Sequence, residues 1–209
     1  MSTRQRHFSM IRDFHLADFF TLANGASGMA AIFLAMEYVR EPRPEKVYGA
    51  ALLVVAALVF DVLDGRIARR RHVACSLGRE LDSLADVISF GVAPACLAYA
   101  AGMSRPLDAI ALLYFAACGI SRLARYNITA EAVTAGGGTV TYFEGTPIPT
   151  STLLVLLLAL LARLNRIGPE LPLGVVVLGP LDLHPLVLLF VLSGSLMISK
   201  TLRIPKPSV

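Results

Sequence analysis

The chain has 209 residues, of which 56% are hydrophobic and 16% are charged. Soluble domains contain about a quarter charged residues, and the mean hydropathy here is +0.66, so the composition argues against a soluble domain. The net charge of +4 is modest, and no nucleic-acid partner is expected. These values predict a single all-α, polytopic membrane domain.

The first 18 residues are too polar to cross a membrane. Phe8, Ile11, Phe14 and Leu16 are interspersed with Arg and His, a pattern that favours an amphipathic helix lying on the membrane surface. A flexible basic tail is the alternative. We therefore expect residues 1–18 to form a cytoplasmic or interfacial segment.

Residues 19–204 are expected to form the membrane domain, followed by a tail over residues 205–209. The stretch Leu171–Leu183 is broken by glycine and proline and predicts an irregular connection. Residues 129–141, with consecutive glycines, predict a loop that is either a mobile lid or a passive linker. Six apolar stretches approach the ~20 residues that a spanning helix needs: about Phe19–Val39, Val47–Arg69, Leu77–Ala101, Leu107–Asn127, Pro149–Leu164 and His184–Leu202.

Basic residues gather on one side of this six-span arrangement, although Arg163 and Arg166 fall on the other. The positive-inside rule then predicts cytoplasmic termini in a cell (inner) membrane. The basic groups lie before the first span, between the second and third, after the fourth and at the C-terminus, and include Arg66, Arg69, Arg70, Arg71, Arg79, Arg122, Arg125, Lys200, Arg203 and Lys206.

Two pairs of aspartates lie in this apolar chain. Asp61 and Asp64 are three residues apart near the end of the second span, and Asp82 and Asp86 are four apart near the start of the third. Both spacings place a pair on one helix face. The short basic linker predicts an antiparallel hairpin that brings the pairs together at the cytoplasmic membrane edge.

Four carboxylates in that space need compensating cations, since each intramembrane acid costs a few kcal/mol. The neighbouring arginines can reach the interface instead. Carboxylate oxygens suit Mg²⁺ or Mn²⁺ rather than zinc, and four of them can hold two ions roughly 3.5–4 Å apart. The three cysteines do not have the spacing of metal ligands, and we expect them to be small apolar residues packed between helices.

The pattern DxxDGxxARx8GxxxDxxxD is complete in this sequence. It resembles the signature of the CDP-alcohol phosphotransferases, a family of integral membrane enzymes. The resemblance implies that Asp61, Asp64, Asp82 and Asp86 bind two divalent metals, with Asp86 also the general base. It further implies a homodimer and a CDP site near these residues: Gly65, Ala68 and Gly78 lining it, and Arg69 beside it.

Four further stretches resemble the phosphatidylserine synthase branch, which joins CDP-diacylglycerol, a membrane lipid, to L-serine. In the last of them, Thr146 stands where that branch commonly has leucine. The stretches are TLANGASG (Thr21–Gly28), SFGVAPA (Ser89–Ala95), SRLARYN (Ser121–Asn127) and YFEGTPIP (Tyr142–Pro149).

Arg122, Arg125 and Asn127 are candidates to bind the carboxylate of serine or a lipid phosphate, with positive-inside anchoring as the alternative for the arginines. Glu144 is either a partner of the serine ammonium or a solvated loop acid. Asn24 either touches the diphosphate or metal site or hydrogen-bonds a neighbouring helix.

Other functions remain open at this point. The same chemistry with glycerol phosphate or inositol phosphate as acceptor would need cations such as Arg122 and Arg125. A cation transporter would also use intramembrane acids, but it does not explain the glycine and alanine positions, and no paired repeat halves are visible. A structural scaffold leaves the acids without a purpose.

Overall fold

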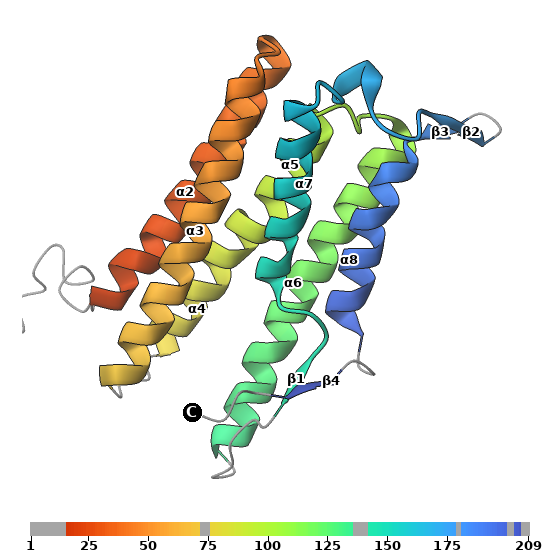
Figure 1. Ribbon diagram of the computed structural model, residues 1–209. Coiled ribbons are helices and arrows are strands. Elements are labelled where there is room, and N and C mark those ends of the chain that lie inside the picture. Colours follow the sequence, from red (N-terminus) through yellow and green to blue (C-terminus); the bar gives the residue numbers. More distant parts are fainter. Residues whose placement is uncertain (1–15, 72–75, 136–141, 179–180, 200–202, 206–209) are drawn as a thin grey trace, which may run out of the picture.

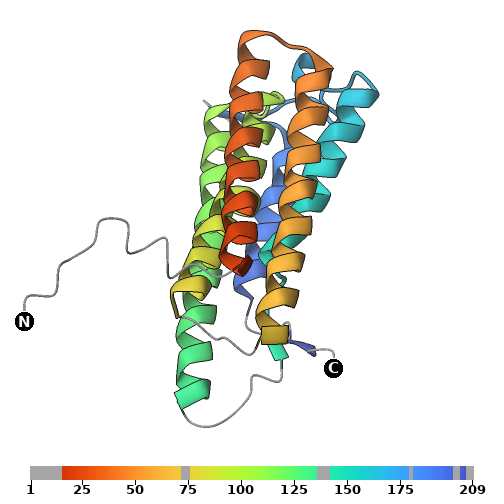
Figure 2. The same cartoon turned by 90° about the vertical axis from the view of Figure 1, so that its left-hand side faces the viewer.

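A computed structural model of the protein describes residues 16–71, 76–135, 142–178, 181–199 and 203–205. Helices running alongside one another form a bundle (Figures 1 and 2). The helices are α2 (Leu16–Arg40), α3 (Pro44–Arg71), α4 (Ser76–Asp86), α5 (Ala93–Ala100), α6 (Pro106–Ala135), α7 (Thr152–Arg163) and α8 (Leu188–Ile198), with a π-helical segment η1 (Val87–Val92) and single turns η2 (Ile148–Ser151), η3 (Gly168–Glu170) and η4 (Pro185–Val187).

Two small antiparallel ribbons lie at opposite ends of the bundle (Figure 1). β1 (Tyr142–Glu144) pairs with β4 (Arg203–Pro205), so that Glu144 lies opposite Arg203 in the register. β2 (Val176–Leu178) pairs with β3 (Leu181–Leu183). The β1–β4 ribbon lies at the end where α2 begins, and the β2–β3 hairpin lies near the start of α6.

The protein is a multi-pass membrane protein. Four apolar helical stretches are long enough to cross a membrane: Ala17–Arg40, Pro44–Ile67, Leu77–Ala100 and Pro106–Thr129. The fifth and sixth expected spans correspond to the shorter apolar stretches Ile148–Arg163 and Pro185–Ile198. Large side chains on the outer faces of the long helices are exposed, among them Phe33, Leu52 and Leu113, as expected for surfaces that face lipid.

Three boundaries differ from the sequence-based expectations. Leu16–Asp18 belong to the first turn of α2, and the rest of the expected interfacial helix lies outside the described residues. α6 continues to Ala135, where a loop was expected from residue 129. The connection over Leu171–Leu183, expected to be irregular rather than a further span, contains the β2–β3 hairpin, and its described residues form no spanning helix.

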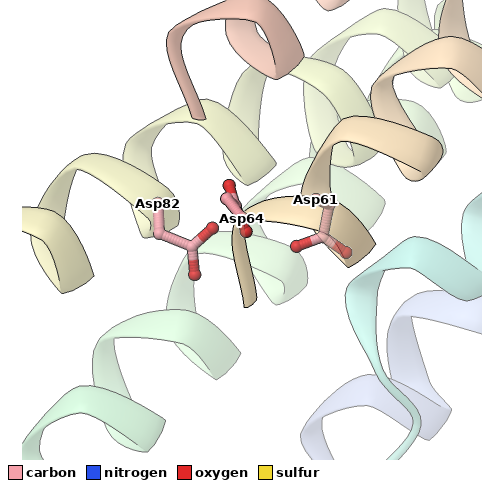
Figure 3. Close-up of side chains that lie close together, drawn as sticks. All are labelled: Asp61, Asp64 and Asp82. Carbon is pink, nitrogen blue, oxygen red and sulfur yellow. The ribbon is translucent and has the colours of Figure 1, made fainter. Parts of the chain in front are cut away.

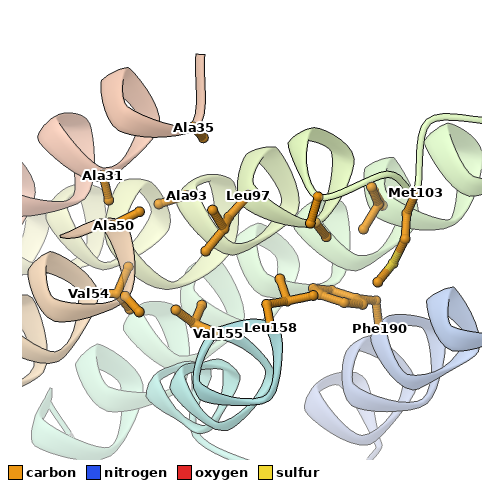
Figure 4. Packing of buried hydrophobic residues seen from close by; sticks show 14 of the residues in the cluster. Ala31, Ala35, Ala50, Val54, Ala93, Leu97, Met103, Val155, Leu158 and Phe190 are labelled. Carbon is orange, nitrogen blue, oxygen red and sulfur yellow. The ribbon is translucent and has the colours of Figure 1, made fainter. Parts of the chain in front are cut away.

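Small side chains allow α2, α3 and α5 to pack closely. Ala31 and Ala35 on α2 and Ala50 on α3 are almost completely buried, and Figure 4 shows them facing the α5 residues Ala93 and Leu97. Helix association in membranes depends on such close packing, because lipid provides no hydrophobic driving force between helices.

The third span is not the regular helix that its apolar run predicts. It consists of α4, then η1, then α5. Pro94 has no backbone N–H, so the Phe90 carbonyl one turn earlier receives no bond from it. Instead, the Ala93 N–H donates to Ile88 five residues back, and the Phe90 carbonyl accepts a 2.7 Å hydrogen bond from the Ser151 hydroxyl. Proline and π-helical turns are recognised causes of such irregularity, and π-turns are frequent at functional sites.

Candidate active site

Three of the four signature aspartates converge where α3 meets α4. Asp61, Asp64 and Asp82 each offer a carboxylate oxygen, and these oxygens lie within 4.8 Å of one another. Figure 3 shows Asp82 extending from α4 toward the two α3 side chains. The three carboxylates therefore meet as the sequence predicts, although α3 and α4 each pack mainly against α2 rather than directly on one another. Asp86 lies one helical turn beyond Asp82 and is outside this group of three.

Helix α2 supports the acids with neutral hydrogen-bond donors. The Thr21 hydroxyl donates to Asp64 Oδ2 at 2.8 Å, and Asn24 Nδ2 donates to Asp86 Oδ1 at 3.0 Å. Both donors are buried. Asn24 thus hydrogen-bonds a neighbouring helix, one of the two options open from the sequence, and its partner is a signature aspartate. Thr21 is the first residue of the stretch TLANGASG. Its contact with Asp64 was not predicted from the sequence.

A glycine lets α2 approach the irregular turn after Asp86. A Cβ atom on Gly28 would lie 2.3 Å from Ser89 Oγ and 2.6 Å from Ser89 Cα. The Ser89 hydroxyl uses this close approach to donate to the Asn24 carbonyl at 2.9 Å. Asn24 is therefore held by Ser89 through its backbone while its side chain holds Asp86. The stretches TLANGASG and SFGVAPA meet at this contact.

A fifth aspartate lies beside the group. Asp18 in the first turn of α2 is 7% exposed, and its Oδ1 lies 3.1 Å from where a Cβ on Gly78 would be. Gly78 thus makes room for a side chain of the protein itself. Asp18 was not predicted from the sequence, because residues 1–18 were expected to form a surface segment. The signal was the spacing of Asp18, Thr21, Asn24 and Gly28, which places all four on one face of α2.

The three candidate acceptor residues on α6 have different surroundings. Asn127 Nδ2 donates to Ser83 Oγ at 3.0 Å and lies 3.3 Å from Glu80 Oε1, so it ties α6 to α4 on either side of Asp82. Arg125 Nη1 lies 3.5 Å from the Ile198 carbonyl at the end of α8. Arg122 is partly buried near Asp86, close enough for their charges to interact. The structure therefore does not bring these three side chains to a common ligand.

Several buried polar atoms at this end have no hydrogen-bond partner among the described residues: Asn24 Oδ1, Asp82 Oδ1 and Arg122 Nε. Buried polar groups in proteins are nearly always paired, so such atoms call for a ligand, ion or water. Converging carboxylates with an unpaired buried oxygen fit a hard divalent cation, and an unpaired guanidinium N–H fits an anion. The donor set therefore suits a metal together with a phosphate or carboxylate.

Some candidate residues cannot be placed in the site. The side chains of Ala68, Arg69 and Glu144 lie outside the described part of the chain, although their backbones belong to α3 and β1. Gly65 directly follows Asp64 on α3.

The arrangement of acids can be compared with known proteins. The family model for CDP-alcohol phosphatidyltransferases matches residues 14–194, nearly the whole described chain. The chain belongs to this family. The matched region includes α2, which supplies Thr21 and Asn24, as well as both helices that carry the acids.

Curated relatives share one chemistry in their names. The CDP-diacylglycerol–serine O-phosphatidyltransferase of Saccharomyces cerevisiae is 42% identical over 206 residues, covering 97% of this chain and 75% of the relative. The Mycobacterium leprae protein of the same name is 35% identical over 77% of this chain, and the archaetidylserine synthase of Methanothermobacter thermautotrophicus is 36% identical over 67%. The chain spans about half the length of these last two relatives, 52% and 55%.

Proposed function

We propose that this protein transfers the phosphatidyl group of CDP-diacylglycerol to the hydroxyl of L-serine, releasing CMP and forming phosphatidylserine. The observation that carries the proposal is the meeting of Asp61, Asp64 and Asp82 from α3 and α4 within 4.8 Å. The proposal is supported by family membership and by relatives whose names state this reaction or its archaeal counterpart.

Asp61, Asp64, Asp82 and Asp86 would hold two Mg²⁺ or Mn²⁺ ions. Such ions neutralise a diphosphate and stabilise the charge on a departing phosphate. Asp64 is oriented for this role by Thr21. The apolar faces of the surrounding helices would accept the acyl chains of the lipid donor.

In the proposed reaction, the serine hydroxyl oxygen forms a bond to the phosphorus that carries the lipid. The bond from that phosphorus to the oxygen of CMP breaks, and CMP leaves with the bonding electrons. Asp86 takes the proton of the serine hydroxyl, and Asn24 Nδ2 holds Asp86 for that transfer. Fixed geometry and charge neutralisation would supply most of the acceleration, because an ionised carboxylate is a weak base.

The donor and acceptor would lie on different sides of the acids. Gly65, Ala68 and Arg69 would line the CDP subsite, together with the backbone of Gly78, whose Cα faces Asp18. Arg122, with an unpaired and buried Nε, would bind the serine carboxylate. We reassign Asn127 from ligand to positioning residue, because its amide already bonds Ser83 and lies beside Glu80, and we leave Arg125 as a more distant cation.

Arg122 also supports the second candidate, a phosphorylated acceptor. A partly buried guanidinium whose Nε has no hydrogen-bond partner among the described residues can bind phosphate as readily as carboxylate. Purified protein in vesicles containing CDP-diacylglycerol separates the two when CMP release is followed with L-serine, glycerol phosphate or inositol phosphate. We expect CMP release with serine. Release with either phosphorylated alcohol and not with serine would contradict the serine acceptor and keep the phosphotransfer chemistry.

The active site would face the cytoplasm in the cell (inner) membrane. Arg66, Arg69, Arg70 and Arg71 lie on the part of α3 that carries the acids or just beyond it, which supports a cytoplasmic position for that end by the positive-inside rule. The family resemblance also leads us to propose a homodimer. Chemical cross-linking in native membranes tests it, since a monomer alone would contradict it.

A further inference from the structure

The β2–β3 hairpin presents an apolar surface outside the bundle. Leu173 and Val177 are 74% and 71% exposed, and Val175, Val176 and Leu181 are also exposed. The sequence contains no charged residue from Leu171 to Leu181. We call the five exposed residues the apolar hairpin surface. Nothing in the catalytic proposal uses it.

One of these side chains is held in an unusual backbone conformation. Leu173 has φ of +69°, a region that bulky residues rarely adopt because of steric clashes. The chain therefore turns a large apolar side chain outward at a position where glycine would be favoured. The neighbouring Leu171 is buried and anchors the segment to the bundle.

Polar contacts fix the base of the hairpin to the start of α6. Asp108 Oδ1 accepts a 2.8 Å hydrogen bond from the His184 backbone N–H, and Oδ2 lies 2.7 Å from His184 Nδ1. Arg105 pairs with Asp182 on β3 at 3.2 Å. Asp108 and Asn127 are about 28 Å apart along α6 at 1.5 Å per residue, so the hairpin lies at the end opposite the acids.

The helices α7 and α8 are shorter than the hydrocarbon core of a bilayer is thick. The apolar stretches of α7 and α8 are each shorter than 18 residues, hence at most about 26 Å long, against ~30 Å for the hydrocarbon core. In Figure 1 the hairpin leaves the bundle sideways at the level where α8 begins, nearer the middle of the bundle than the turn joining α2 and α3.

We propose that the apolar hairpin surface inserts into the outer leaflet of the bilayer, with lipid as its occupant. The surface contains no charged residue, and polar contacts fix the hairpin beside the start of the spanning helix α6. The outer backbone edges of a two-stranded ribbon need water, which the hydrocarbon core lacks. The hairpin therefore lies at the boundary between headgroups and acyl chains, with Leu173 and Val177 directed into the chains.

The chain contains no tryptophan, so a single introduced tryptophan reports its own surroundings. The test is Val177→Trp in the full-length protein, reconstituted in phosphatidylcholine vesicles with bromine either near the headgroup end or near the methyl end of the acyl chains. We expect blue-shifted emission and about twofold or greater quenching by the shallow bromines, with weaker quenching by the deep ones. Val175→Trp gives an independent reading if Val177→Trp does not fold.

Two matched variants calibrate the experiment. Leu52→Trp on the exposed face of α3 (70% exposed) reports lipid and should be quenched by bromine. Pro42→Trp, in the exposed turn between Glu41 and Arg43, reports water and should not. Red-shifted, unquenched emission from Val177→Trp would overturn the proposal in favour of solvent exposure. Blue-shifted emission without bromine quenching would overturn it in favour of a protein partner, a second copy included.

Discussion

The two ends of the bundle treat the buried oxygen atoms of an aspartate in opposite ways. At the hairpin end, Asp108 is fully buried and both of its oxygens have partners: two N–H groups of the backbone, at Arg105 and His184, and the His184 ring. At the other end, Asp82 points toward two further acids, and its Oδ1 has no hydrogen-bond partner within the described chain. The difference teaches that the protein satisfies Asp108 by itself and leaves the acidic group to be satisfied by something bound.

The strongest test of this comparison exchanges a carboxylate for an amide at both ends. Asp82→Asn removes a proposed metal ligand, so we expect CMP release to fall by about a thousandfold or more while the melting temperature stays the same or rises, because repulsion between acids is relieved. Asp108→Asn should lower the free energy of unfolding by about 2–4 kcal/mol.

Activity and thermal unfolding measured on both variants show whether Asp82 acts in the reaction and Asp108 in stability. The folded Asp108→Asn protein should keep its activity per molecule. Equal loss of activity in the two folded variants would contradict the division between a satisfied and an unsatisfied aspartate.

Asn24→Ala sharpens the comparison within the acidic end, because it removes the donor that holds Asp86. We expect kcat to fall by about a hundredfold, with a smaller change in KM for CDP-diacylglycerol. Ser27→Ala is the matched control, since that hydroxyl bonds only the Ala23 carbonyl of its own helix among the contacts described. Similar kinetics for the two variants would remove Asn24 from its positioning role.

Much of the acidic end was predictable from the sequence, and the reasons are physical. Spacings of three and four residues fix a helix face whatever packs against it, so the convergence of Asp61, Asp64 and Asp82 followed from a short linker. The donors on α2 were harder to find, because which face of a helix meets a neighbour depends on packing. The role of Gly28 is clear only once Ser89 is known to lie against it.

The irregular parts were less predictable. The apolar run from Leu77 to Ala101 has the same composition whether or not a π-turn interrupts it, and only the bond from Ser151 to the Phe90 carbonyl explains how the break is stabilised. Residue spacing also could not show whether Asn127 binds a ligand or links α6 to α4 by hydrogen bonds. The second role is visible only from the positions of Ser83 and Glu80.

Gly28→Ala tests the close approach that supports Asn24. The added Cβ would lie 2.6 Å from Ser89 Cα, so α2 and η1 must separate, and we expect a loss of about 1–3 kcal/mol in the free energy of unfolding together with reduced activity. Gly49→Ala is the control, because its Cβ would meet only the flexible end of Leu34. An unchanged melting temperature for Gly28→Ala would show that the approach is not required.

Thr21→Val should give the smallest change. It preserves shape and removes the hydroxyl that donates to Asp64 at 2.8 Å. We expect about a tenfold fall in kcat/KM, the equivalent of one hydrogen bond to a charged group. Thr21→Ser should restore most of the activity in the same assay, and a serine variant as impaired as the valine variant would attribute the effect to packing.

The binding of divalent cations tests the central claim most directly. Mn²⁺ titrated into the purified protein, with free Mn²⁺ followed by electron paramagnetic resonance, should reveal two bound ions per chain. Asp82→Asn should weaken binding by about a hundredfold or more, whereas Asp108→Asn should bind as the original protein does. No Mn²⁺ or Mg²⁺ binding by the original chain, or unchanged binding by Asp82→Asn, would contradict the account.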